Sequence, residues 1–178
     1  MPAARNNRFG QGFTLLETMM VVAIIAILTA MAVPSYRSLT GVASVERFVQ
    51  QLQMAEQGLR QYAIFNRGYP ANVTTGVLPP GLQKHLPSGF DWTAPTPLGG
   101  NWNWDGKART SWGFYFEYGI SISPLYGALQ SQSFFEDVDR RVDDGNLNTG
   151  NFRKHNQSWS TYAYAIQLNA NSPWGTTQ

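Results

Sequence analysis

The sequence predicts an α+β fold in which a long N-terminal helix packs on a small antiparallel sheet with one additional helix. Three patterns support this prediction. An apolar run is followed by a segment with helical periodicity, and later segments alternate apolar and polar residues as half-buried strands do. Between those alternating segments lies a second, shorter segment with helical spacing. We therefore expect one small domain after an N-terminal hydrophobic arm.

The apolar run occupies residues 13–33 and contains a single charged residue, Glu17. Its 21 residues match the length that crosses the ~30 Å hydrocarbon core of a bilayer. The twelve residues before it carry Arg5 and Arg8 and no acidic residue. Inserting a carboxylate within a membrane segment costs roughly 2.5–3.5 kcal/mol, so its presence predicts a functional role for Glu17.

Pro34 follows the apolar run, and we expect a kink or a locally melted turn there because proline removes one helical hydrogen bond. Beyond it, apolar residues recur at spacings of three and four, which places them on one helical face. They are Val42, Val45, Val49, Leu52, Ala55, Leu59 and Tyr62. Asn66-Arg67-Gly68, followed by Tyr69-Pro70, predicts the end of this helix.

The remainder of the chain predicts a short helix, three strands and a second helix. The short helix covers residues 82–86, and the second helix contains Phe134, Phe135, Val138 and Val142 and ends near Gly145. The first strand is Asn101–Trp104, after which Asp105-Gly106 begins a turn. The other two strands are Trp112–Ser123 and Ser160–Asn169.

Composition excludes several classes of function. The chain has no cysteine, so thiol catalysis, thiolate metal sites and disulfides are excluded. Its net charge is +2 and its basic residues form no run, so we expect no nucleic-acid partner. His85 and His155 stand in no recognisable triad or metal-ligand spacing, so we expect no catalytic residues and no enzyme.

The segment GQGFTLLETMMVVAIIAILTAMAVPSY resembles the N-terminus of type IV pilins and type II secretion pseudopilins. That family has a short basic leader, a glycine before a cleavage site, usually a phenylalanine after it, and a glutamate near the start of an apolar helix. Gly12, Phe13 and Glu17 match these positions. The resemblance implies cleavage between Gly12 and Phe13 by a prepilin peptidase, which also methylates the new amine. Glu17 would then pair with the Phe13 amine of its own or a neighbouring subunit and favour assembly.

The resemblance also implies an organisation: a basic leader (1–12), a transmembrane and filament-core helix (13–36), and a periplasmic globular domain (37–178). The expected function is that of a pseudopilin-like structural subunit of a helical filament in a type II secretion or related type IV filament system. The protein would cross the bacterial inner membrane once and be extractable into a periplasmic or extracellular filament. Its expected partners are further copies of itself, the prepilin peptidase, other pseudopilins, the inner-membrane assembly platform and the membrane.

Two alternatives to the pseudopilin remain open. The first is a type IV pilin or minor pilin; many pilins close their C-terminal region with a disulfide, so the absence of cysteine favours a pseudopilin. The second is a membrane-tethered glycan-binding module with an aromatic platform for sugar rings. The tryptophans available for such a platform are Trp92, Trp102, Trp104, Trp112 and Trp159.

Several oxygen-bearing side chains lie within ten residues at the predicted end of the second helix. Asp143, Asp144, Asn146 and Asn148, with Asp139 nearby, are the ligand types that calcium prefers. The resemblance supports calcium, since major pseudopilins of type II secretion commonly hold this ion in a C-terminal loop. The alternative is a helix C-cap, because Asp143-Asp144-Gly145-Asn146 also suits a turn without any metal. Calcium is therefore the one cofactor that the sequence suggests.

Overall fold

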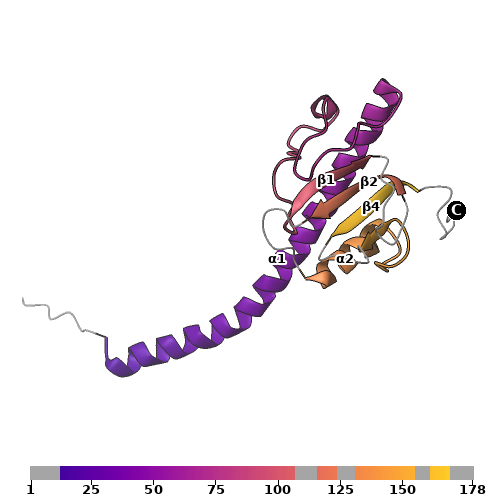
Figure 1. Ribbon diagram of the computed structural model, residues 1–178. Coiled ribbons are helices and arrows are strands. Elements are labelled where there is room, and N and C mark those ends of the chain that lie inside the picture. Colours follow the sequence, from indigo (N-terminus) through magenta and orange to yellow (C-terminus); the bar gives the residue numbers. More distant parts are fainter. Residues whose placement is uncertain (1–12, 107–115, 124–130, 155–160, 169–178) are drawn as a thin grey trace, which may run out of the picture. The chain divides into compact units, whose positions relative to one another are not determined.

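The computed structural model describes residues 13–106, 116–123, 131–154 and 161–168, and of residues 32–39 the backbone alone. It confirms the α+β fold, with a long helix and a four-stranded antiparallel sheet (Figure 1). Its contacts divide the chain into two units, Met1–Thr40 and Gly41–Gln178. The helices are α1 (Leu15–Asn66), the 3-10 helix η1 (Leu82–Lys84) and α2 (Gln132–Val142). The strands are β1 (Asn101–Gly106), β2 (Phe116–Ser123), β3 (Phe152–Lys154) and β4 (Tyr162–Leu168).

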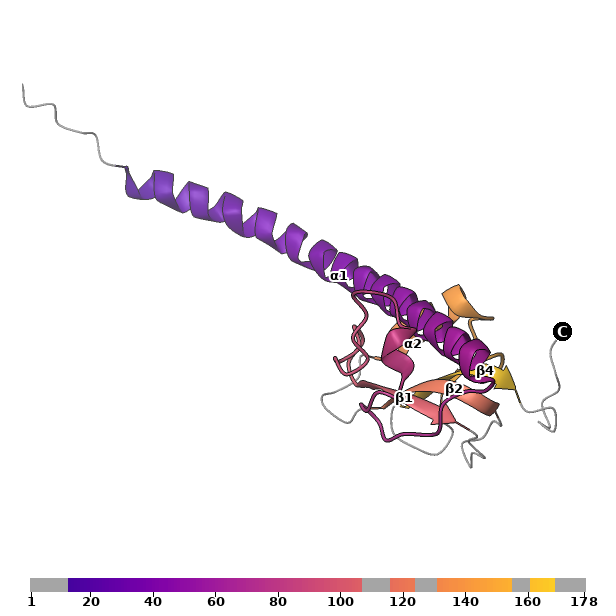
Figure 2. The same ribbon diagram turned by 90° about the horizontal axis from the view of Figure 1, so that it is seen from above.

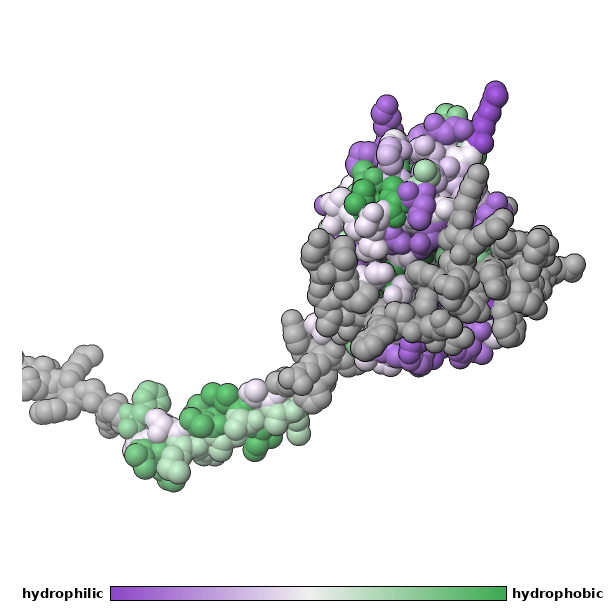
Figure 3. Space-filling model, viewed as in Figure 1, coloured by the Kyte–Doolittle hydropathy of each residue, from purple (hydrophilic) through white to green (hydrophobic). Residues whose placement is uncertain are grey.

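The first unit contains the N-terminal part of α1. Every described side chain from residue 13 to residue 31 is exposed, and Figure 3 shows this apolar surface in green. Within the described part of the chain, no helix combines the length and the apolarity needed to span a membrane. The backbone around Pro34 is helical, so the locally melted turn expected there is absent, while the kink stays a prediction.

The second unit buries one face of the C-terminal part of α1. Val45, Val49, Leu52, Ala55 and Leu59 are buried and Tyr62 is partly buried, as their spacing predicts. Two corrections apply to this face. Val42 was expected on it but is 50% exposed, and Phe48, which the predicted set lacked, is fully buried. Phe48 lies three residues after Val45 and four before Leu52, so its burial widens the apolar stripe without changing its helical period.

The sheet has the strand order β1-β2-β4-β3, and all neighbouring strands are antiparallel. The C-terminal part of α1 covers one of its faces, which the two perpendicular views show (Figures 1 and 2). β2 is described from Phe116 onward, and residues 112–115 of the longer predicted strand lie outside the described residues. β3 was not predicted. It has three residues, too few to show an alternating pattern.

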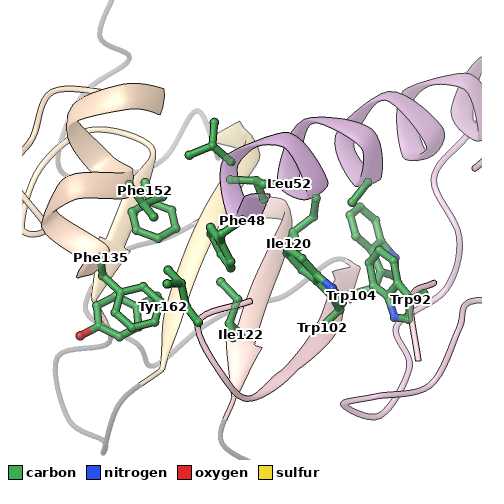
Figure 4. Close-up of a cluster of buried hydrophobic side chains, with 14 of the residues drawn as sticks. Phe48, Leu52, Trp92, Trp102, Trp104, Ile120, Ile122, Phe135, Phe152 and Tyr162 are labelled. Carbon is green, nitrogen blue, oxygen red and sulfur yellow. The ribbon is translucent and has the colours of Figure 1, made fainter. Parts of the chain in front are cut away.

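Aromatic side chains fill the space between α1, α2 and the sheet (Figure 4). Phe48 of α1 stacks on Trp102 of β1 with ring centroids 5.3 Å apart and meets the edge of Phe135 of α2 at 6.2 Å. Phe135 also stacks on Tyr162 of β4, with centroids 3.7 Å apart. Rings of this size bury a large apolar area, so they stabilise a domain that has no disulfide. The second helix therefore belongs to the same core as the long helix and the sheet.

β1 extends two residues beyond its predicted end, through Asp105 and Gly106. The sequence predicts a turn at these residues because Asp-Gly is common in hairpin turns. The structure shows a different use for Asp105: its carboxylate accepts hydrogen bonds from the Asn103 amide at 2.9 Å and from the Ser121 hydroxyl of β2. Burial raises the pKa of Asp105, and these two hydrogen bonds act in the opposite direction. A paired, buried carboxylate thus keeps this dipeptide in the strand.

Both edges of the sheet offer little free backbone for pairing with a further strand. Along β1, the backbone N–H of Gly76 donates to the carbonyl of Trp102 at 2.8 Å, and Pro95 forms an isolated bridge with Asn101. The Trp104 indole also donates to the carbonyl of Pro70 at 3.0 Å. The loop between α1 and β1 therefore covers that edge. The opposite edge is the three-residue strand β3.

The loop from α2 to β3 is held by Asp143, the residue that follows the helix. Its carboxylate accepts the backbone N–H of Phe152 at 3.0 Å and that of Asn151. Gly145 and Gly150 have φ angles of 81° and 69°, a conformation that favours glycine. A Cβ atom at Gly150 would overlap the Asp143 carboxylate. The predicted end of the second helix near Gly145 is confirmed, and Asp143 connects that end to β3.

We predict that Phe48→Ala lowers the free energy of unfolding by about 3–5 kcal/mol, because it removes a fully buried ring and leaves a cavity between α1, β1 and α2. The measurement is urea unfolding of the full chain in detergent, followed by tryptophan fluorescence. Val42→Ala is the matched control on the same helix, and its effect should stay within about 0.5 kcal/mol because Val42 is exposed. Equal losses in the two variants would contradict the central place of Phe48 in the core.

We also predict that Gly150→Ala destabilises the protein by more than about 1 kcal/mol, since alanine is strained at a positive φ angle and its Cβ would displace Asp143. Gly68→Ala is the control, because a Cβ atom there meets no atom within 4 Å. The same unfolding assay serves for both variants. A Gly150→Ala protein as stable as the Gly68→Ala protein would show that the loop does not depend on the contact between residues 143 and 150.

Candidate functional site

The first candidate site is the start of α1. Gly12 lies outside the described residues, whereas Phe13 and Glu17 are described and exposed. Thr14 caps the helix: its side-chain oxygen accepts the backbone N–H of Glu17 at 3.3 Å, and its carbonyl accepts the same N–H at 3.1 Å. A threonine followed three residues later by a glutamate has the spacing of a capping box. The Thr14–Glu17 spacing is the signal in the sequence that predicts this cap.

Glu17 therefore has a local role as well as the predicted role in assembly. An acidic side chain in the first turn interacts favourably with the positive end of the helix dipole. Among the described residues, no side chain or backbone group forms a hydrogen bond or ion pair with the Glu17 carboxylate. The carboxylate is thus available to a group from outside the described chain.

The polar side chains within the exposed apolar segment are satisfied by their own helix. The Thr18 hydroxyl donates to the carbonyl of Leu15 at 2.8 Å, and the Thr29 hydroxyl donates to the carbonyl of Ile25 at 2.7 Å. In an apolar environment an unsatisfied hydroxyl is costly, so these bonds suit a helix surface that leaves water. Glu17 then remains the one acidic or basic side chain between residues 13 and 31.

The second candidate site is at the C-terminal end of α2. Asp139, Asp143 and Asp144 each place a carboxylate oxygen within 4.8 Å of the others. Asp139 lies on the last turns of α2 and is 0% exposed, and neither of its carboxylate oxygens has a hydrogen-bond partner. Asp143 is partly buried and Asp144 is exposed. The structure therefore brings two predicted calcium ligands together with a third, buried carboxylate.

Burial raises the pKa of Asp139 to about 7, and the negative charges of Asp144 and Asp143 add to this rise. The nearby Gly145 backbone N–H and the Arg140 charge act in the opposite direction. Arg153 interacts electrostatically with these carboxylates. Burial lowers the pKa of Arg153, and the negative charges of Asp143, Asp144 and Asp139 act in the opposite direction. Three carboxylates in one place thus make an unfavourable local charge in the absence of a compensating cation.

The two predicted asparagine ligands take part in the turn itself. The side-chain oxygen of Asn146 accepts the backbone N–H and the side-chain amide of Asn148, both at 3.2 Å. Asp144 accepts the backbone N–H of Asn146 at 2.9 Å and the hydroxyl of Thr149 at 2.6 Å. These bonds match the turn chemistry that the sequence suggested as the alternative to calcium. Neither Asn146 nor Asn148 belongs to the carboxylate cluster.

The tryptophans that are described do not form a surface for sugar binding. Trp92, Trp102 and Trp104 are at most 1% exposed and belong to the core (Figure 4). The hypothesis of a platform built on them is therefore wrong; Trp112 and Trp159 lie outside the described residues. Of the two histidines, His155 also lies outside them, and His85 packs between Phe65 and Tyr62 with ring centroids 5.4 and 5.5 Å away.

Comparison with known proteins finds relatives of the N-terminal segment. Residues 8–33 match the family model of the prokaryotic N-terminal methylation motif. The chain is 34% identical over 74 residues to a type IV major pilin protein PilE1 of Neisseria gonorrhoeae, an alignment that covers 42% of this chain and 35% of the relative. It is 33% identical over 69 residues to a fimbrial protein of Neisseria meningitidis serogroup A, covering 39% of this chain and 41% of the relative. No solved structure matches the chain.

The chain thus spans less than half the length of the curated relatives that it matches, and the methylation motif accounts for only part of α1. The matched motif contains Gly12, Phe13 and Glu17, the residues on which the resemblance was based. The long N-terminal helix and the antiparallel sheet agree with the fold that the resemblance implies. The N-terminal segment of the chain is therefore similar to that of type IV pilins.

Proposed function

We propose that this protein is a structural subunit of a type IV filament and not an enzyme. The observation that carries the proposal is the N-terminal methylation motif at residues 8–33, which opens a helix whose apolar side chains between residues 13 and 31 are exposed. Type IV pilins self-assemble into filaments and are processed by a prepilin peptidase. An exposed apolar helix of this kind needs either lipid or other helices around it, and a filament of identical subunits supplies the latter.

We further propose that residues 13–33 anchor the precursor in the bacterial inner membrane, with residues 1–12 as a cytoplasmic leader and the globular domain in the periplasm. The uncharged sequence between Glu17 and Tyr36 and the basic leader support this orientation. Cleavage after Gly12 creates a positive amine at Phe13. Glu17 supplies the opposite charge one turn away, on the same subunit or on a neighbour, and so favours one register of assembly.

The type of filament system is a finer question. The relatives reported above are a type IV major pilin and a fimbrial protein, which favours a pilus subunit. The absence of cysteine favours a type II secretion pseudopilin, the interpretation that we preferred from the sequence. In either system the proposed partners are further copies of the chain, the prepilin peptidase and an inner-membrane assembly platform. A pseudopilin would also contact other pseudopilins.

We predict that the mature protein begins at Phe13, because Gly12-Phe13 stands behind a basic leader within the matched motif. Mass spectrometry of membrane-extracted protein from a host with an active prepilin peptidase should find an N-terminal Phe13 that carries a methyl group. Gly12→Leu should leave the precursor uncut, with normal stability of the globular domain. Recovery of intact Met1 from the wild-type chain in that host would refute the processing proposal.

We predict that Glu17→Gln prevents filament assembly while precursor abundance and cleavage stay normal. Glutamine keeps the capping-box spacing with Thr14, because glutamate and glutamine both serve at that position, but it removes the charge. If Glu17 pairs with an amine in an apolar environment, loss of one partner costs ~3–5 kcal/mol. The measurement is the yield of filaments sheared from cells, together with cross-linking between cysteines introduced on adjacent helices.

Glu17→Ala and Thr14→Ala complete this comparison. Glu17→Ala removes the charge but keeps the Thr14 cap, because that cap uses the backbone N–H of residue 17, so it should fail like Glu17→Gln. Thr14→Ala removes the hydroxyl acceptor of the cap and keeps the carboxylate, so it should assemble. Normal filaments from Glu17→Gln, with a defect in Thr14→Ala, would show that assembly depends on the Thr14 helix cap and not on an ion pair of Glu17.

A further inference from the structure

The last turn of α1 carries an exposed apolar surface. Ile64 and Phe65 are each 76% exposed, whereas the next most exposed large apolar side chains described in the second unit, Val42 and Val77, are 50% and 49% exposed. Single exposed apolar side chains are common on protein surfaces. Two adjacent ones at the end of a helix form a surface that gains from contact with another molecule.

Positive charges surround this apolar surface. His85 stacks on Phe65 with ring centroids 5.4 Å apart, so Lys84, the last residue of η1, lies near the same end of α1. Lys84 and Arg67 are exposed, and neither forms an ion pair with another described residue. Residues 57–90 contain no acidic residue. We call the following four residues the basic tip: Ile64, Phe65, Arg67 and Lys84.

Arg67 stands where a helix commonly ends in glycine. Its φ angle is 58°, and it is the one non-glycine residue with a positive φ angle in the part of the chain that the structure describes. The helix is closed by the next residue, since the backbone N–H of Gly68 donates to the carbonyl of Ala63 at 3.0 Å. Strained conformations of this kind cluster at functional sites, so the Arg67 side chain indicates a role beyond ending the helix.

The loop after α2 concentrates negative charge. Asp139 is fully buried, and neither of its carboxylate oxygens has a hydrogen-bond partner. Asp143 and Asp144 place carboxylate oxygens within 4.8 Å of it and of each other, and the adjacent Arg140 pairs with Asp137. A buried carboxylate without a partner is costly. The cluster of residues 139, 143 and 144 therefore gains from a cation on its exposed side, where Asp144 lies.

The basic tip and the carboxylate cluster lie far apart on one domain. The ion pair between Arg141 and Glu46, at 2.9 Å, holds the end of α2 beside an early turn of α1 in the second unit. From residue 46 to residue 65 the helix rises by about 29 Å at 1.5 Å per residue. Figure 1 shows α2 and the end of α1 at opposite ends of the globular unit. The tip of a chain therefore does not reach the cluster of the same chain.

We propose that the basic tip of one copy of the chain binds the carboxylate cluster of a second copy, head to tail. The Arg67 guanidinium and the Lys84 ammonium group supply the positive charge that the cluster needs, and the two apolar side chains of the tip exclude water from the contact. Each such contact leaves one tip and one cluster free, so it can repeat from copy to copy.

This inference rests on the proposed filament, which brings copies of the domain together. It adds a contact between globular domains to the association of the exposed apolar residues 13–31. A second copy is the occupant that the charges favour, because the chain itself carries the complementary surface. The competing explanation is that the two surfaces do not meet and the tip faces water or a different protein.

Cysteine cross-linking tests the contact directly, because the chain has no cysteine of its own. Gln83→Cys lies beside the tip and Asn148→Cys beside the cluster, and both positions are exposed. The two full-length variants are expressed together in a host with an active prepilin peptidase and oxidised, and both sheared filaments and membranes are analysed. We expect a disulfide-linked dimer from the pair and several-fold less dimer from either variant alone, because a head-to-tail contact joins two different surfaces.

Charge exchange tests which residues make the contact. Arg67→Glu combined with Lys84→Glu, in the cysteine variant of the tip, should lower the dimer yield several-fold, and so should Asp144→Arg in the cysteine variant of the cluster. Expressing these two changed chains together should restore the dimer, since the charges are then exchanged. Arg47→Glu is the matched control: it changes an exposed arginine of α1 outside the tip and should leave the dimer yield unchanged.

The melting temperature of each full chain in detergent shows whether the variant folds. Asp144→Asn removes the charge and keeps an acceptor for the backbone N–H of Asn146, so it tests the same contact if Asp144→Arg does not fold. Filaments that form without the dimer between residues 83 and 148 would overturn the inference and leave the proposed filament in place. The absence of filaments would overturn the proposed function instead, and the membrane fraction would still show whether the two surfaces meet. A dimer that persists in the folded charge variants, or that charge exchange does not restore, would also overturn the inference.

Discussion

The ring of Phe48 contacts both the sheet and the second helix, and the arrangement of the globular unit depends on these contacts. Phe48 stacks on Trp102 of β1 and meets the edge of Phe135 of α2, which stacks in turn on Tyr162 of β4. One aromatic series therefore connects α1, α2 and two strands. Since α2 carries Asp139 and leads into Asp143, the packing of this series also determines where the carboxylate cluster forms.

α1 satisfies two different requirements along its length. In the globular unit it has a buried apolar face and polar residues on its other sides, and the buried core begins at Val45. In the N-terminal unit the apolar side chains are exposed, and the side chains of Thr14, Thr18 and Thr29 form hydrogen bonds with the backbone of the helix. The core is therefore complete without the exposed segment. We therefore expect changes to that segment to alter association with its surroundings, and changes between Val45 and Leu59 to alter folding.

The sequence predicts most of the fold because its main signals are periodic. Helix positions of α1 and α2 repeat at three and four residues, and β2 and β4 alternate. Signals without a period were harder to read. β3 has too few residues to alternate. Asp105-Gly106 has the composition of a turn, but a hydrogen bond from Ser121 holds Asp105 in β1. Phe48 is buried although it lies beside the apolar positions that the helical spacing predicts.

The two candidate sites differ in the same way. Gly12, Phe13 and Glu17 form a linear motif, so the sequence alone predicts them as site residues, and they lie within the residues 8–33 that match the methylation motif. Asp143 and Asp144 are visible in the sequence as oxygen-rich residues, but the burial of Asp139 depends on α2 packing against the core. Three-dimensional packing therefore determines which carboxylates of this acidic segment form a cluster.

The restricted edges of the sheet matter most when many copies of the domain are crowded together. An open strand edge offers free backbone N–H and carbonyl groups to any neighbour, and crowded copies would then join sheet to sheet in an unlimited series. Here a loop covers β1, while β3 ends the sheet after three residues that include Arg153 and Lys154. Lateral strand exchange between domains is thereby disfavoured. In the proposed filament, copies would then associate through the exposed apolar side chains of residues 13–31 and not through the edges of their sheets.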